Sequence, residues 1–250
     1  MKRMLVAVVV GGWALTFVPA VLAQTADDIV EKHLAAMGGR AALAKITNEA
    51  ASGAISIATA EVELQGTVEV YRKAPNLGHT RISLDLSALG GSSMVIDQIC
   101  DGKTAVARNS LQGDREITGD QLQGMLNAGF PSGFLNYKDA GAKIDLVGKD
   151  KIGDKAVYVL NFAPKAGPAS RIFLDAETYL IIKTVSKANI PEAGGEMEQT
   201  TEVSDYRTVN GVKAPFTIMS INAAQTVVMK LSKLEWNAAI DDALFSRGGK

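Results

Sequence analysis

Few side chains in this sequence could do chemistry. Its histidines are His33 and His79, and its one cysteine is Cys100. Structural and catalytic metals need several His, Cys or carboxylate ligands at short spacings, and the sequence shows no such cluster. It also contains no Gly-x-Ser-x-Gly, no Ser-x-x-Lys and no phosphate-binding glycine loop. We therefore expect no metal, no cofactor and no catalytic residues.

Two patterns resemble catalytic ones but lack the geometry. Tyr179 and Lys183 have the Tyr-x-x-x-Lys spacing of short-chain dehydrogenases, which needs a helix, whereas these residues fall in a predicted strand. Paired carboxylates occur at Asp27–Asp28 and Asp241–Asp242. Adjacent residues point in different directions, which is poor geometry for shared acid and base work. Neither pattern predicts an enzyme.

The histidine and cysteine positions favour structural roles. His33 falls on a predicted helix, where we expect an exposed or capping residue and no catalytic base. Cys100 ends the run that starts at Ser93, so a small buried side chain is favoured over a reactive thiol. A single cysteine forms no intramolecular disulfide.

The N-terminus has the pattern of a secretory signal peptide over 1–23. A short basic start precedes an apolar run over 5–18, and small residues end at Ala23. The apolar run is shorter than the roughly 20 residues that a membrane span needs, so a retained anchor is the less favoured alternative. We expect cleavage after Ala23 and export of residues 24–250 as one soluble, monomeric domain.

The charge balance gives no sign of a nucleic-acid partner. The chain has 26 basic and 27 acidic residues, a formal net charge of −1, without long runs of one sign. Nucleic acid and anionic lipid attract surfaces with a clear excess of positive charge. We expect neither partner on the basis of charge.

Helices are predicted at the N-terminus and in the middle of the chain. Thr25–Asp28 has the form of a capping box, and apolar residues then recur at helical spacing until Gly38–Gly39. Arg40–Lys45 predicts a second, short helix. Thr118 caps a third, which interrupts a long series of strands.

That series is organised around a hairpin over 170–187. Arg171–Leu174 and Tyr179–Val185 are apolar runs, and Asp175–Thr178 supplies the turn. Both faces of the second run are apolar, whereas an antiparallel strand with one face in water alternates. Either helices cover that face, or it lines a concave surface for an apolar molecule.

Period-two alternation predicts further strands along the chain. They are Glu61–Tyr71, Thr80–Leu86, Met94–Cys100, Thr104–Asn109, Lys143–Val147, Ala156–Phe162, Glu196–Tyr206, Val212–Ile221 and Thr226–Trp236. Turn signals at Asp101–Gly102 and Asn210–Gly211 favour antiparallel hairpins. We expect one large antiparallel sheet that curls into a partial or closed barrel.

The segment after the third helix is unusually apolar for a connection. Gly129–Gly133 and Phe134–Tyr137 either plug a cavity as part of the structure or contact a ligand. In the second case they form, with the helix, a movable lid with hinges at Gly124, Gly129 and Gly133. The proposed lid residues are Leu122, Met125, Leu126, Phe130, Phe134 and Leu135, facing Tyr158, Leu160, Phe162 and Phe173.

Several segments resemble the outer-membrane lipoprotein-sorting protein family, the LolA-like carriers. They are Ala36–Gly39, Phe173–Leu180, Asp205–Val212 and Pro215–Ile218. The resemblance implies a periplasmic protein, mainly β with some α. It also implies a strongly curved antiparallel sheet, a half-open barrel closed by an N-terminal helix and a mid-chain helix and loop. The best understood members carry acyl chains in the apolar space between.

The function expected from this resemblance is that of a periplasmic carrier. Its ligand would be the acyl chains of a lipid or lipoprotein, with envelope membrane proteins as donor and acceptor. The alternative is an envelope interaction module with a filled core, for example the partner of a peptidase or an assembly machine. An enzyme is the least favoured class.

Overall fold

The computed structural model of the chain describes residues 24–190 and 195–248. The signal peptide predicted over 1–23 lies outside these residues. Within the described part of the chain, no helix is long and apolar enough to cross a membrane.

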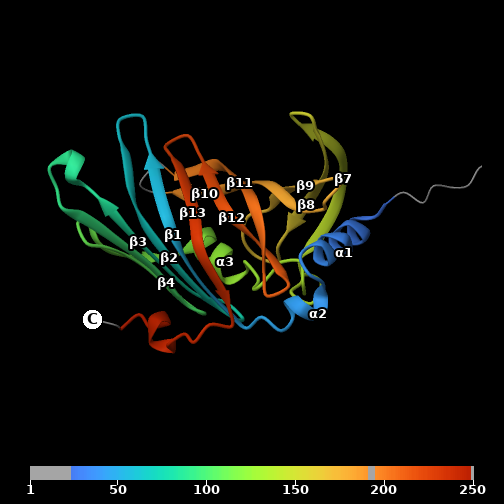
Figure 1. The fold of residues 1–250 in the computed structure, drawn as a ribbon, viewed down its shortest axis with the longest axis horizontal. Coiled ribbons are helices and arrows are strands. Elements are labelled where there is room, and N and C mark those ends of the chain that lie inside the picture. Colours follow the sequence, from blue (N-terminus) through green and yellow to red (C-terminus); the bar gives the residue numbers. More distant parts are fainter. Residues whose placement is uncertain (1–23, 191–194, 249–250) are drawn as a thin grey trace, which may run out of the picture.

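The 13 strands form one antiparallel sheet whose ends stay apart (Figure 1). Its order is β6-β5-β4-β3-β2-β1-β13-β12-β11-β10-β9-β8-β7, so the first and last strands meet in its middle. The strands are β1 Asn48–Ala58, β2 Glu63–Lys73, β3 Leu77–Asp85, β4 Ser93–Asp101, β5 Ala105–Asn109, β6 Gly113–Ile117, β7 Lys143–Ile152, β8 Lys155–Ala163, β9 Ser170–Asp175, β10 Ile181–Ile190, β11 Gly195–Val209, β12 Val212–Ile221 and β13 Thr226–Trp236. The curved, half-open sheet predicted from the sequence is confirmed.

The helices lie on the concave side of this sheet (Figure 1). They are α1 Ala26–Ala36, α2 Arg40–Leu43 and α3 Gly119–Leu126. The short 3-10 helices are η1 Ser87–Leu89, which follows β3, and η3 Asp242–Phe245, which contacts β3 and β4. The predicted capping box starts α1: the backbone N–H of Asp28 donates to Thr25 Oγ1 at 3.2 Å, and that of Thr25 donates to the Asp28 carboxylate at 2.9 Å. Packing places α1 against β7 and α3 against β10.

Alternation along the central strands separates the two faces of the sheet. On β2, Leu64 and Val68 face the concave side, whereas Glu63, Gln65 and Glu69 are exposed on the convex side. The apolar residues of β1, β3 and β13 pair in register with this inner row. Burying apolar side chains on one face only fixes the register of the strands.

Glycines allow the sheet to bend sharply at its centre. A Cβ at Gly66 would overlap the carbonyl oxygen of Ser83 and lie 2.9 Å from the Cα of Leu84, both on the neighbouring strand. A Cβ at Gly53 would lie 2.7 Å from the Cα of Leu231, beside a bulge in the β1–β13 pairing. Only a residue without a side chain lets the neighbouring backbones approach so closely.

Two predictions about strands were wrong. Tyr179 does not start a strand: it has φ 57° in the turn, and β10 begins at Ile181. The Asp175 carboxylate accepts the backbone N–H groups of Glu177 and Thr178 at 3.0 and 2.9 Å, so this Asx-type turn extends beyond the predicted four residues. Strand β6 was not predicted, because Gly113–Ile117 has no apolar alternation.

Candidate functional site

The concave face carries an apolar surface in the middle of the sheet. Ile55, Val68 and Leu84 are buried at its centre. Around them lie partly exposed side chains, here called the apolar floor: Ile57, Leu64, Ile82, Leu86, Met94, Val227 and Met229. Cross-strand pairs such as Ile57 with Leu64 and Ile55 with Met229 make the surface continuous from β3 to β13.

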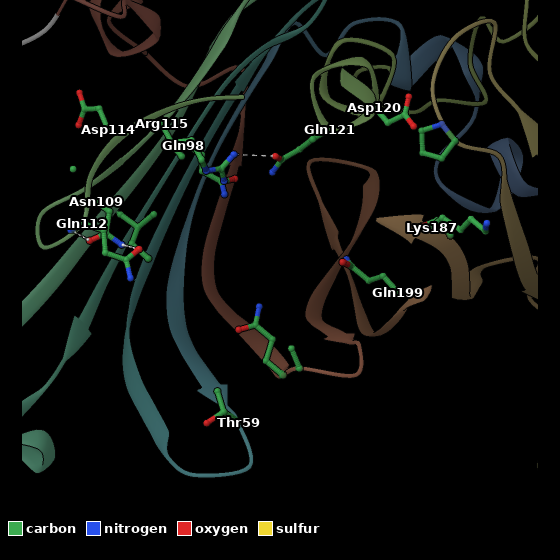
Figure 2. A pocket seen from close by; sticks show the side chains of 18 residues that line it. Thr59, Gln98, Asn109, Gln112, Asp114, Arg115, Asp120, Gln121, Lys187 and Gln199 are labelled. Atoms are coloured by element: carbon green, nitrogen blue, oxygen red, sulfur yellow. Dashed lines mark hydrogen bonds between the residues drawn. The ribbon is translucent and has the colours of Figure 1, made fainter. Parts of the chain in front are cut away.

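A cavity of about 850 Å³ adjoins the apolar floor. Figure 2 shows side chains of β4 to β6 on one wall, α3 on a second, and β10, β11 and the β12–β13 turn on a third. Ile96 lines the cavity and pairs with Ile82 of the floor, so the two surfaces meet. This polar cavity includes Thr59, Gln98, Asn109, Gln112, Asp114, Arg115, Asp120, Gln121, Lys187, Gln199 and Gln225.

The polar cavity has two acidic lining residues, Asp114 and Asp120, and two basic ones, Arg115 and Lys187, so its charges balance. Lys187 forms an ion pair with Glu196 at 2.6 Å, and Asp114 lies 3.6 Å from Arg108. Arg115 donates a hydrogen bond to Gln121 at 3.3 Å. The cavity therefore offers mainly uncharged polar groups to a ligand.

Some of the residues predicted to bind a ligand lie in a packed core under α1. Phe134 is 4% exposed and Leu160 is fully buried, in one cluster with Leu135 and Tyr158. Phe130 and Phe162 pack against that cluster and are partly buried. Phe134 meets the ring of His33 edge-on, with 5.2 Å between the ring centroids. This cluster fills the β7–β9 end of the concave side.

The helix residues of the predicted lid form a separate group. Leu122, Met125 and Leu126 pack against a buried cluster at the opposite end of the sheet. That cluster consists of Cys100, Ala105, Ala107 and Ile117. Cys100 is 2% exposed, which confirms its predicted burial.

The structure does not bring Phe173 together with the other predicted residues. On β8 and β9, Tyr158 pairs with Leu174 and Leu160 with Ile172, whereas Phe173 pairs with Val159 on the opposite face. Its ring lies 5.7 Å from the Lys183 ammonium group.

A small pocket is lined by two of the predicted residues. Met125 and Phe130 line a space of about 180 Å³ together with Arg72, Cys100 and Gln98, and Gln98 also lines the polar cavity. The Arg72 guanidinium lies 5.4 Å above the Phe130 ring and pairs with the buried carboxylate of Glu49. None of the predicted ligand-binding residues lines the polar cavity.

His33 is buried, so the prediction of an exposed or capping residue was wrong. It is 3% exposed, and its Nδ1 lies 2.8 Å from the carbonyl oxygen of Tyr179. Burial lowers the pKa of this imidazole below its usual 6.5, although the Tyr179 carbonyl opposes the shift. A neutral ring that donates from Nδ1 satisfies both observations. Helical periodicity alone did not reveal that α1 buries this face.

The paired carboxylates have structural partners. Asp27 pairs with Lys138 at 2.5 Å and accepts a hydrogen bond from Tyr137, and these two contacts lower the pKa of Asp27. Asp241 accepts the backbone N–H of Ala243 at the start of η3. Among the described residues, no group of His, Cys, Asp and Glu side chains could hold a metal ion.

The polar cavity was not predicted from the sequence, although the alternation of residues on β4 gave a signal for it. Gln98 lies between Ile96 and Cys100 at a period of two. On a strand, this period places Gln98 on the face of its apolar neighbours. Polar residues inside an apolar row are a signal for a site.

Comparisons with known proteins agree with this architecture. A LolA superfamily protein from Nitrosomonas europaea aligns over 90% of this chain and 99% of its own, with a TM-score of 0.57 and 15% identity. A DUF1329 family protein from Desulfovibrio piger covers 89% and 97%, with a TM-score of 0.57 and 11% identity. A putative outer membrane lipoprotein-sorting protein domain from Vibrio parahaemolyticus covers 87% and 94%, with a TM-score of 0.52 and 12% identity.

No protein-family model and no curated protein sequence matches the chain. The solved structures are only 11–15% identical in sequence to this chain, so the similarity shows a shared fold and no more. The half-open sheet, its concave helices and these three alignments together establish that the chain has the LolA-like fold.

Proposed function

We propose that the protein is a periplasmic carrier that holds the acyl chain of a lipid or lipoprotein on the apolar floor. The observation that supports this proposal best is the floor itself. Its apolar side chains are partly exposed beside a cavity that meets the floor at Ile96, whereas a structural core would bury them.

The energy available from the floor is sufficient for a useful affinity. Burying about six CH₂ groups contributes roughly 5 kcal/mol at ~0.8 kcal/mol each, before the cost of ordering the chain. Met94 and Met229 suit ligands of differing shape, because thioether side chains repack easily. A carrier needs this adaptability and a moderate affinity, since it must also release its ligand.

The lid is part of the same proposal. Glycines with left-handed backbone lie at the two ends of α3: Gly119, with φ 58°, is its first residue, and Gly129, with φ 68°, follows its last residue by three. The inner side of α3 presents Leu122 and Met125, which are partly buried. Rotation about the flanking glycines would let α3 move away from β10 and admit a chain, while the Phe134 cluster stays packed.

Export and the partners follow from the carrier role. The signal-peptide pattern over 1–23 supports delivery to the periplasm, and envelope membrane proteins would act as donor and acceptor of the ligand. We expect the carrier to act as a monomer.

Adjacent residues of β13 provide a matched test. Met229 belongs to the apolar floor, and Lys230 is exposed on the opposite face. In a titration with a fluorescent fatty-acyl probe, Met229→Glu should weaken binding by about tenfold or more. The reason is that contact with the acyl chain would remove water from the charged carboxylate, which costs free energy. Lys230→Glu should bind like the parent. Thermal unfolding checks both folds, and Met229→Gln replaces the acidic variant if that variant does not fold.

The result also decides between the two function classes. The packed cluster around Phe134 and Tyr158 favours the alternative, an interaction module with a filled core. If the parent protein binds no apolar probe, the interaction module replaces the carrier. If the folded Met229→Glu binds like the parent, the chain lies elsewhere than on the apolar floor.

A further inference from the structure

The polar cavity is lined by glutamine carboxamide groups that form no hydrogen bond with other described residues. Gln98 on β4, Gln199 on β11 and Gln225 in the β12–β13 turn line its walls and are partly exposed. Among the described residues, the side chains of these three glutamines have no hydrogen-bond partner. Each carboxamide offers an acceptor oxygen and two N–H donors.

Their placement suits a ligand that lies between them. The three glutamines come from separate parts of the sheet, and Figure 2 shows Gln98 and Gln199 on different walls of the cavity. A ligand group in the space of about 850 Å³ would reach several of them together, and this volume falls within the range of small-molecule sites.

The charge pattern restricts the chemistry of that group. The charged side chains that line the cavity are Asp114, Asp120, Arg115 and Lys187, so its positive and negative charges balance. Lys187 is also paired with Glu196. A phosphate or sulfate needs positive charge that is not already compensated. An uncharged group with many hydroxyls fits better, because hydroxyls, like carboxamides, both donate and accept.

The cavity and the apolar floor form one continuous surface. Gln98 follows Ile96 by two residues on β4, and Gln225, in the turn before β13, lines the same cavity as both. Side chains two apart on a strand point the same way. A molecule with its acyl chain on the floor therefore has its head group in the polar cavity.

We infer that the ligand is a glycolipid, whose sugar head group is held by Gln98, Gln199 and Gln225. This inference rests on the carrier function proposed above and adds the class of the head group. An acylated peptide is less suitable, because extended peptides usually pair with the edge of a sheet, and none of these glutamines lies on the edge strands β6 and β7.

Calorimetric titration with three amphiphiles of equal chain length tests the head group. The probes are dodecyl maltoside, dodecylphosphocholine and an N-dodecanoyl Gly-Ser-Ser amide, each below its critical micelle concentration. We expect the maltoside to bind about tenfold more tightly than the other two, as a few net hydrogen bonds would provide. Equal affinities, or tighter binding of either other probe, would overturn the inference and leave the carrier function standing.

Single variants locate the head group. Each of Gln98→Leu, Gln199→Leu and Gln225→Leu should weaken maltoside binding about fivefold and leave dodecylphosphocholine binding unchanged. Gln65→Leu, on the convex face of β2, is the matched control and should change neither. Maltoside binding that is unaffected by all three cavity variants would contradict the assignment.

Free maltoheptaose separates this inference from the carrier function. If no dodecyl probe binds but the oligosaccharide does, the sugar site stands and the carrier function fails. If neither binds, both proposals fail.

Discussion

His33 is a buried titratable side chain whose state should be visible in the stability of the protein. Its pKa is lowered by burial, so the folded ring stays neutral at a pH where the unfolded ring, with a pKa near 6.5, takes up a proton. The unfolded state then binds more protons, and the free energy of unfolding falls as the pH drops below 6.5.

We expect the parent protein to lose unfolding free energy between about pH 6.5 and 5.5 through His33, by up to about 1 kcal/mol. The variant His33→Asn keeps a donor near the Tyr179 carbonyl, but its side chain does not titrate. Its free energy of unfolding should therefore depend less on pH over this range. Urea unfolding at several pH values measures the difference. Equal slopes for both proteins would show that His33 is not the group responsible.

Phe134 belongs to the core in spite of its place in a loop. Its ring contacts His33 and lies 6.2 Å from Phe162, and its exposure is 4%. Phe134→Ala should lower the free energy of unfolding by about 3 kcal/mol, through lost burial and the cavity left behind. Phe130→Ala, at a partly buried ring in the same loop, is the matched comparison and should cost less. A loss below about 1 kcal/mol at Phe134 would place that ring outside the core.

At the scale of the elements, the glycines of the central strands determine how sharply the sheet bends. Gly66→Ala should destabilise the protein by about 3 kcal/mol, since its methyl group would overlap the backbone of β3. Gly78 provides the control, because a Cβ there meets no atom within 4 Å. Gly78→Ala should be neutral or stabilise by up to about 1 kcal/mol. Similar denaturant midpoints for the two variants would show that the bend does not depend on Gly66.

The elements were largely predictable from the sequence. Alternation at period two in runs such as Glu61–Tyr71 and the turn signals at Asp101–Gly102 and Asn210–Gly211 indicated most of the strands. Local patterns did not show that Tyr179 adopts a left-handed conformation, because its long-range contacts are with His33, which lies 2.8 Å from its carbonyl oxygen, and with the stacked ring of Tyr158.

The site was less predictable because it depends on contacts between distant strands. Apolar content identified Phe134 and Leu160 as inward-facing, but it could not distinguish a packed core from a ligand surface. The polar cavity combines Gln98 and Gln199, which are far apart in sequence and meet only when the sheet curls. The bending of the whole sheet therefore creates the site.

On the scale of the whole molecule, the concave side has three regions. One end is filled by the cluster of α1 and Phe134, and the other is covered by α3. The apolar floor and the polar cavity lie between these ends. A filled end gives rigidity, and the partly open centre leaves room for a ligand.

Native mass spectrometry of the protein purified from a bacterial envelope tests the central proposal most directly. We expect a population heavier than the bare chain, which loses its extra mass on extraction with organic solvent and releases an acyl-containing molecule. The Met229→Glu variant, prepared in the same way, should carry much less of it, whereas Lys230→Glu should carry as much as the parent. A parent protein that has the mass of the bare chain, and gives no acyl species on extraction, would contradict the carrier function.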